Sequence, residues 1–243
     1  MSDRTDPHRE SVRESVHELL TRWTRPLRPG GNYRSPAEGD ETPVIELEDI
    51  TKRFGPILAL DGVDCQFERG RVHGVVGPNG SGKTTLFEIV LRLRRPTVGT
   101  VIAPPPREMG YSFQQPQFYG TLTVRENLRV FSRLNAPLDA EWLKTLTGDL
   151  GLDRVAQRPA GELSGGFQQK LDLALAFLSR PDVVILDEPL ADVDELSRGR
   201  ILELIADYSD CGGTVLVSSH NHELLDPVVD NAVELHKGTV VTE

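Results

Sequence analysis

Cysteine is scarce in this 243-residue sequence: Cys65 and Cys211 stand far apart and in no metal-ligand spacing. Structural zinc sites and disulfide frameworks need several cysteines at regular intervals, so neither is expected. Few and isolated cysteines are typical of proteins kept in a reducing compartment. We therefore predict a cytosolic setting in which both thiols are reduced.

Long apolar runs are also missing. No stretch approaches the roughly 20 residues that cross a bilayer as a helix. The first residues carry charges throughout, where a secretory signal would have an apolar core. We expect neither a membrane span nor a signal peptide, so a role at a membrane would require docking to another subunit.

Positive charge is in the minority. The chain has 27 Lys and Arg against 37 Asp and Glu, which gives a net charge of −10. Nucleic-acid backbones are bound by clustered cations, so no nucleic-acid partner is expected. A nucleotide needs only a few positive groups, and a local phosphate site is compatible with this composition.

The sequence divides into an extension, residues 1–43, and one domain, residues 44–243. Apolar side chains recur at helical spacing between Glu10 and Trp23, and Gly- and Pro-rich sequence follows. We interpret the extension as an amphipathic helix with a flexible linker. Such a helix would contact a permease or the membrane surface, or it would pack on its own domain or be partly disordered. Packing on the domain is the commoner arrangement for an amphipathic helix.

From Val44 onward, predicted strands and helices alternate, which is typical of a parallel sheet covered by helices. The expected strands are 44–50, 63–68, 71–76, 98–102, 108–113, 183–186 and 214–218. The expected helices are 83–94, 140–150, 196–208 and a segment around 124–128, with a hairpin near 232–241. No internal repeat is visible, so we expect one set of nucleotide-binding motifs.

A glycine-rich turn follows the apolar strand that ends at Val76. The segment consists of Gly77, Pro78, Asn79, Gly80, Ser81, Gly82, Lys83, Thr84 and Thr85. Its first eight residues fit the phosphate-loop (P-loop) pattern Gly-x4-Gly-Lys-Ser/Thr. Glycines let consecutive backbone N–H groups converge on an anion, and the helix beginning at Lys83 directs its positive end at the same phosphates. We expect Lys83 to bridge the β- and γ-phosphates of a nucleotide and the Thr84 hydroxyl to bind Mg²⁺.

Two acids end an apolar run later in the chain. Asp187 and Glu188 follow Val183–Leu186, which has the pattern of a buried parallel strand with a ligand-binding carboxyl end. Alone, such acids would as readily be solvated turn residues. Combined with a P-loop, the pattern predicts that Asp187 holds Mg²⁺ and that Glu188 orients or deprotonates an attacking water.

The segment Leu163–Lys170 closely resembles the signature sequence of ATP-binding-cassette proteins. Ser164 is suited to cap a helix whose first amides, near Gly165 and Gly166, point at a γ-phosphate. In that family the phosphate belongs to ATP held by the opposite subunit. The resemblance therefore implies a head-to-tail dimer, homomeric or heteromeric, with two ATP molecules between its subunits.

The resemblance covers about residues 44–243 and implies further site residues. Gln114 matches the coupling glutamine, which senses Mg²⁺ and links the site to a transmembrane partner. His220 matches the switch histidine at the γ-phosphate. Phe54 matches the aromatic residue that stacks on adenine, and Asp194 matches the acid of the loop after the catalytic glutamate.

The same resemblance implies the architecture and the activity. The fold expected is α/β, a RecA-like P-loop NTPase with a parallel-sheet core, an N-terminal antiparallel β subdomain and a helical signature subdomain at about residues 115–178. The activity expected is Mg²⁺-dependent ATP hydrolysis, with Glu188, His220 and Lys83 as the catalytic residues.

Two functions stay open at this point. One is the motor of a membrane transporter, and the other is a soluble cassette ATPase that assembles a complex such as an iron-sulfur scaffold. The compact segment between Gln114 and Ser164 and the likeness of residues 118–128 to the permease-facing segment favour the transporter. Segments 128–134, 164–178 and 217–225 look most like export ATPases. We expect a peripheral protein at the cytoplasmic face of the cell membrane, bound to an integral-membrane permease subunit.

Overall fold

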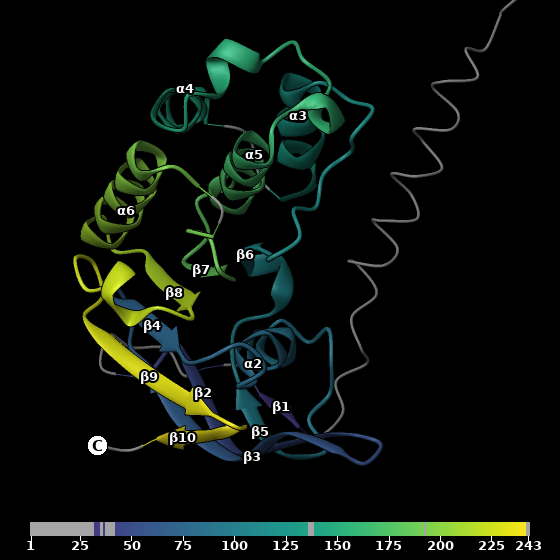
Figure 1. The fold of residues 1–243 in the computed structure, drawn as a ribbon, viewed down its shortest axis with the longest axis vertical. Helices are drawn as coiled ribbons and strands as arrows, with labels where there is room; N and C mark the ends of the chain where they lie inside the picture. The colour runs from purple at the N-terminus through teal and green to yellow at the C-terminus, as the bar shows by residue number, and fades with distance from the viewer. Residues whose placement is uncertain (1–31, 35, 37–41, 136–138, 192, 242–243) are drawn as a thin grey trace, which may run out of the picture. The chain divides into compact units, whose positions relative to one another are not determined.

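Two β-sheets and their covering helices make up the described part of the chain, which is all drawn in colour in Figure 1. The computed structural model describes residues 32–34, 36, 42–135, 139–191 and 193–241. These residues belong to one compact unit, Gly31–Glu243. The amphipathic helix predicted in the extension, and most of the predicted linker, lie outside the described residues.

The larger sheet has the strand order β10-β9-β4-β8-β7-β6. Its strands are β4 (Val72–Val76), β6 (Met109–Ser112), β7 (Val183–Leu186), β8 (Thr214–Ser219), β9 (Asn231–His236) and β10 (Thr239–Val241). All neighbours pair in parallel except β10, which returns antiparallel to β9. The central strands are buried along their whole length, as expected when both faces are covered. The predicted parallel-sheet core is confirmed.

The smaller sheet has the strand order β1-β5-β2-β3. Its strands are β1 (Tyr33–Arg34), β2 (Ile45–Phe54), β3 (Ile57–Phe67) and β5 (Val98–Ile102). β2 pairs antiparallel with both β3 and β5, and this agrees with the antiparallel subdomain expected. β1 pairs parallel with β5, so two residues of the predicted extension join this sheet.

The β2–β3 hairpin is longer than the sequence indicates. Strands were expected at 44–50 and 63–68, whereas β2 has 10 residues and β3 has 11, joined through Gly55 with φ 57°. Asp49 has φ 48°, and the pairing register shifts on both sides of Ile50. These β-bulges interrupt the period-two pattern, so the outer half of the hairpin has no regular alternation to recognise.

The helices are α2 (Lys83–Val90), α3 (Val124–Asn135), α4 (Ala140–Asp149), α5 (Gly165–Phe177) and α6 (Glu195–Asp210). Short 3₁₀ turns occur at Pro106–Glu108, Leu152–Val155, Ala160–Glu162 and His222–Leu224. α2 ends four residues before the predicted end, because Arg92 has φ 56° and the N–H groups of Leu93 and Arg94 turn back to the Glu88 carbonyl. None of the helices in the described ranges is long and apolar enough to cross a membrane.

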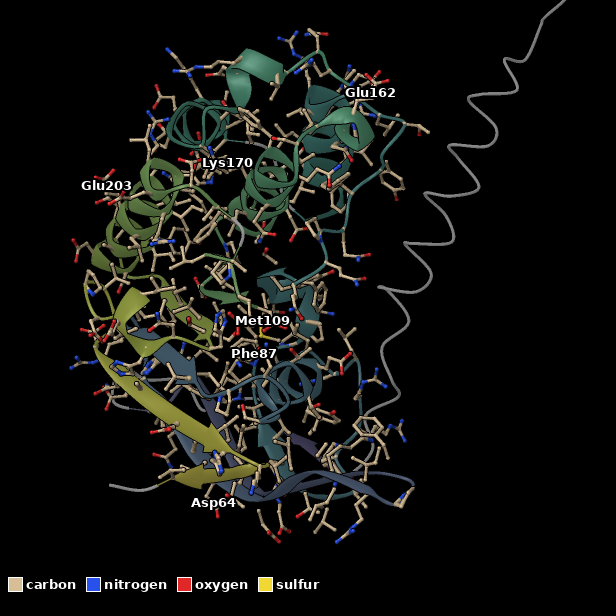
Figure 2. All side chains as sticks on the ribbon, viewed as in Figure 1. Asp64, Phe87, Met109, Glu162, Lys170 and Glu203 are labelled. Atoms are coloured by element: carbon tan, nitrogen blue, oxygen red, sulfur yellow. The ribbon has the colours of Figure 1, made fainter. Side chains whose placement is uncertain are left out.

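Two apolar cores hold these layers together. The first surrounds α2 between the two sheets and includes Phe87 and Met109, which lie in the interior in Figure 2. The second lies under α3, α4, α5 and α6 and includes Phe177. Each fully buried Phe of this kind contributes about 1.5–3 kcal/mol through removal of apolar surface from water. Asp64 and Glu203, by contrast, lie at the surface.

The strand order decides which loops meet. β8 lies between β4 and β7, and all three strands run in the same direction. The loops that follow them therefore emerge at one edge of the sheet, where ligands of open parallel sheets bind. This edge brings together the P-loop after β4, the acids after β7 and the residues after β8.

Candidate nucleotide site

The P-loop is pressed against two other strands. Gly77 has φ 146°, and a Cβ there would lie 2.1 Å from the carbonyl oxygen of Leu235 in β9. Gly82 has φ 113°, and a Cβ there would lie 2.7 Å from a side-chain carbon of Leu60 in β3. Only glycine fits both the conformation and the space at these two positions. The loop is therefore held in one shape by β3 and β9.

The outer side of the loop is open. Pro78, Asn79, Gly80 and Thr84 are exposed, and a Cβ at Gly80 would meet no atom within 4 Å. The next positions turn inward: Thr85 is half-buried, and the hydroxyl of buried Ser81 has no hydrogen-bond partner within the described residues. The loop thus offers an accessible concave backbone of the kind that binds an anion.

Lys83 lies inside the loop rather than pointing into solvent. Its side chain is 6% exposed, and the ammonium donates to the carbonyl oxygen of Gly77 at 2.7 Å. The same nitrogen lies 3.2 Å from Oε1 of Glu188. A buried ammonium is costly unless it is paired, and the Glu188 carboxylate supplies the opposite charge. The structure therefore joins the P-loop cation to the acid after β7.

Asp187 faces the start of α2. The Thr84 hydroxyl donates to Oδ2 of Asp187 at 2.7 Å. Burial raises the pKa of Asp187, and hydrogen bonds from Ser218 and Thr84 oppose that rise. A hydroxyl and a carboxylate side by side suit Mg²⁺, which prefers oxygen ligands and commonly adds waters and phosphate oxygens to one or two protein groups. The two residues fit the metal role expected from the sequence.

Glu188 has an unusual backbone for a residue with a side chain. Its φ is 52°, in the left-handed region, which costs about 1–3 kcal/mol for a non-glycine residue. The carboxylate is 8% exposed, and its Oε2 lies 2.9 Å from Nδ1 of His220, which is 50% exposed. Strain of this kind persists where the surroundings impose it, and here it turns the carboxylate toward both Lys83 and His220.

Ser218 links the two acids and was not identified from the sequence. Its hydroxyl donates to Oδ1 of Asp187 at 2.6 Å and accepts from the backbone N–H of Glu188 at 2.8 Å. The side chain is buried near the carboxyl end of β8. The signal that could have identified it is the Ser-Ser pair that ends β8 after an apolar run, once β8 is known to lie between β4 and β7.

The N-terminus of α5 is open, as the signature resemblance requires. Ser164 occupies the N-cap position, but its hydroxyl makes no capping hydrogen bond, so the expected side-chain cap is absent. Instead, its carbonyl accepts from the N–H groups of Phe167 and Gln168. A Cβ at Gly165 or Gly166 would meet nothing within 4 Å. The first turn of α5 is therefore accessible to a ligand or partner.

Three further predicted residues form no hydrogen bond or ion pair with the Lys83–Glu188–His220 cluster within the described part of the chain. Gln114 is exposed. Phe54 is 36% exposed at the end of β2, and the cations of Lys52 and Arg94 lie 5.0 Å and 5.1 Å from the centre of its ring. Asp194 caps α6 by accepting from the backbone and hydroxyl of Ser197, and these bonds lower its pKa.

Known proteins resemble this chain over most of its described part. The family model described as "ABC transporter" matches residues 60–191. YbhF of Escherichia coli (strain K12), a probable multidrug ABC transporter ATP-binding protein, is 35% identical over 190 residues. The alignment covers 73% of this chain and 33% of YbhF, so the chain spans about a third of that relative.

Two other relatives align over more of their own length. Nod factor export ATP-binding protein I of Burkholderia lata is 33% identical over 212 residues, which cover 82% of this chain and 70% of the relative. Zinc import ATP-binding protein ZnuC of Photobacterium profundum is 33% identical over 198 residues, which cover 80% of this chain and 76% of the relative.

Solved structures share the fold. An ATP-binding subunit of an ABC transporter superimposes with a TM-score of 0.76 at 26% identity, over 82% of this chain and 88% of that one. The cassette MJ0796, described as a dimer in a post-hydrolysis state bound to ADP and Pi, gives a TM-score of 0.72 at 25% identity. That comparison covers 82% of this chain and 97% of MJ0796.

Proposed function

The chain belongs to the ABC transporter family of ATP-binding cassettes, and on this premise we propose that it is the ATP-hydrolysing subunit of a membrane exporter. The observation that carries the proposal is the cluster in which Lys83 pairs with Glu188 and Glu188 meets His220. These three side chains come from three loops at one edge of the sheet. Such a cluster can bind a triphosphate and accept a proton beside it.

The P-loop and α2 would bind the phosphates of ATP. The inward-facing amides and the N-terminus of α2 favour negative charge, and Lys83 adds a cation at the same place. Thr84 and Asp187 would hold Mg²⁺, which would neutralise charge on the phosphate oxygens. Phe54 would contact adenine from the β2–β3 hairpin, whose second strand touches the P-loop at Leu60.

Glu188 would accept the proton of the attacking water. The water oxygen forms a bond to the γ-phosphorus, the bond from that phosphorus to the bridging oxygen breaks, and ADP leaves with the electron pair. His220 lies against Oε2 of Glu188 and would hold the carboxylate in place while contacting the γ-phosphate. Positioned general-base catalysis of this kind contributes about 10²–10⁴-fold to the rate.

A second subunit would complete the site. Ser164, Gly165 and Gly166 leave the N-terminus of α5 open, and a helix N-terminus binds phosphate readily. We propose that it contacts ATP held by the partner cassette in a head-to-tail dimer. MJ0796, which has the same fold, is described as a dimer bound to ADP and Pi, and this supports a dimer.

A membrane permease would be the second partner, and export would be the direction of transport. Two of the three relatives above are named for multidrug transport and Nod factor export, and one is named for zinc import. The cassette would then work at the cytoplasmic face of the membrane through this permease.

A trapped complex tests the proposal. Glu188→Gln should bind Mg-ATP, accumulate as a closed dimer and hydrolyse at least about 100-fold more slowly than the unaltered protein. The tagged variant would be purified from gently solubilised membranes in Mg-ATP. Recovery of a protein with several membrane spans near one-to-one supports the transporter. Recovery of a soluble scaffold and no membrane protein would replace it with an assembly ATPase.

A further inference from the structure

A buried aspartate joins α5 to the segment that follows β6. Asp172 is 3% exposed, and within the described residues it forms no ion pair. Its Oδ2 accepts from the Ser112 hydroxyl at 2.6 Å and from the Phe113 N–H at 3.2 Å. Its Oδ1 accepts from the Gln117 N–H at 2.6 Å. All three donors belong to one short stretch of chain.

That stretch contains Gln114. The donors at Ser112 and Phe113 precede it, and the donor at Gln117 follows it, so the carboxylate of Asp172 fastens the loop on both sides of Gln114. Gln114 itself stays exposed. The loop is thus fixed at its base while its outer part remains accessible to a partner.

The energetics favour a specific role for this carboxylate. Burial raises the pKa of Asp172 to about 7, and the three hydrogen bonds oppose that rise. A buried acid without a cation is costly, and an apolar side chain would fill the same space without that cost. The stabilising contribution of Asp172 therefore lies in its bonds to the loop.

α5 is itself packed tightly along β6. A Cβ at Gly110 would lie 1.9 Å from the carbonyl oxygen of Ala176, so the helix and the strand are in close contact there. The Gln169 amide donates to the Ser112 hydroxyl at 3.4 Å, one turn from Asp172. Ser164, the N-cap of the same helix, lies about two turns from Asp172 in the same direction as Gln169. The open N-terminus and the anchored loop thus share one rigid element.

We propose that Asp172 is a positioning residue that couples the Gln114 loop to α5, so that this loop and the signature end of the helix move as one body. The inference rests on the proposed function, in which Gln114 responds to Mg²⁺ and the permease and Ser164 contacts ATP across the dimer. A shift of the loop would then be transmitted directly to the second half of the ATP site.

Two substitutions graded in strength test the coupling. Asp172→Ala removes all three acceptor contacts. Asp172→Asn keeps one acceptor oxygen and replaces the other with an NH₂ group, which cannot accept from the N–H or O–H donors. It is the milder variant and can be used if the alanine protein does not fold. The matched control is Thr214→Ala. Thr214 is 2% exposed at the start of β8, at the opposite end of that strand from Ser218, and its hydroxyl accepts from the Gly70 N–H at 3.0 Å.

Amide hydrogen exchange, ATP affinity and kcat would be measured on each purified protein. In the Asp172 variants, exchange at Phe113 and Gln117 should rise about tenfold, the effect of one lost hydrogen bond. The Kd for ATP should stay within about twofold, because the P-loop is untouched, while kcat falls at least about fivefold. Thr214→Ala, compared at an equal fall in Tm, should leave kcat and exchange at Gln117 near the unaltered values.

Two results would overturn the coupling. One is unchanged exchange around Gln114 in both Asp172 variants. The other is an equal loss of kcat in Thr214→Ala at matched Tm, which would reduce Asp172 to a general stabilising role. If the unaltered protein hydrolyses no ATP, the proposed function fails. The exchange measurement still decides whether Asp172 holds the loop, so the two failures are distinguishable.

Discussion

Lys83 and Glu188 form an ion pair inside the protein: the ammonium nitrogen lies 3.2 Å from Oε1, and the two side chains are 6% and 8% exposed. The pair compensates two charges that would each be costly to bury alone. In the proposed mechanism, an incoming phosphate competes with Glu188 for Lys83. Nucleotide binding and release of the general base are then linked through one cation.

Replacing Lys83 by alanine should weaken ATP binding at least about tenfold, because a charge-assisted contact is lost. It should also lower the free energy of unfolding of the nucleotide-free protein by about 1–3 kcal/mol, since Glu188 stays buried without its cation. Nucleotide titration and urea unfolding measure the two effects. Lys144→Ala, at an exposed position on α4, is the control and should change neither. Normal ATP affinity in Lys83→Ala would remove the P-loop assignment.

Ser218→Ala should lower kcat about tenfold or more and destabilise the protein by about 1–3 kcal/mol, because the Glu188 N–H loses its acceptor. Asp187 also loses a hydrogen bond that lowers its pKa, so the acidic limb of the pH–rate profile should move to higher pH. Steady-state kinetics across pH test both. The control is Ser219→Ala, at a buried serine whose hydroxyl bonds only Asn221 within the described residues. Equal kinetics in the two variants would contradict a special role for Ser218.

Gly238→Ala should weaken nucleotide binding several-fold, although Gly238 belongs to the C-terminal hairpin. Its N–H donates to the Ser81 carbonyl at 2.9 Å, its carbonyl accepts from the Asp61 N–H at 2.8 Å, and its φ is 86°. A Cβ there would lie 2.7 Å from the carbonyl oxygen of Ala59, so the turn must shift away from the P-loop. Calorimetric titration with ATP measures the change.

The matched control for this substitution is Gly212→Ala. Gly212 has φ 91°, but a Cβ there would meet nothing within 4 Å. Both alanines therefore carry a similar backbone strain, and only one of them displaces a neighbour of the P-loop. We expect both variants to lose a similar amount of stability. Only Gly238→Ala should also lose affinity for ATP. Equal affinities would show that the hairpin does not hold the loop.

His73 should make the protein less stable in mild acid. Burial lowers the pKa of the His73 imidazole. Its Nε2 lies 2.9 Å from the carbonyl oxygen of Glu68, which lies between β3 and β4. Below a pH of about 6.5 the unfolded chain binds a proton that the folded state resists, so the free energy of unfolding falls by up to about 1.4 kcal/mol per pH unit until the folded pKa is reached.

Urea unfolding between about pH 8 and about pH 5, a range that brackets the ordinary histidine pKa of about 6.5, measures this slope. His73→Gln should flatten the slope, because the buried imidazole is then absent. A slope that His73→Gln leaves unchanged would assign the acid sensitivity to other groups.

The motifs could be predicted from the sequence because each is local. The P-loop needs glycines at a fixed spacing before a helix, and the acids need only an apolar strand before them. Ser218 and Asp172 could not be predicted, because their roles depend on strand order and on a helix packed across a distant strand. The early end of α2 depends on the left-handed backbone conformation of Arg92. Arginine rarely adopts this conformation, so the residue type does not predict it. The full length of the β2–β3 hairpin could not be predicted either, because its β-bulges break the alternation of buried and exposed residues.

The position of β8 between β4 and β7 also limits how far the parts of the site can move relative to one another. Adjacent strands are about 4.8 Å apart, so the strand before the P-loop and the strand before Glu188 are fixed about 10 Å from one another by two hydrogen-bonded ladders. Thermal motion or partner binding can tilt helices, but it cannot alter this separation without unpairing the sheet. The distance between the strand before the P-loop and the strand before Glu188 is therefore constant in one subunit. A partner that controls the reaction must act through groups that approach the site from outside the sheet.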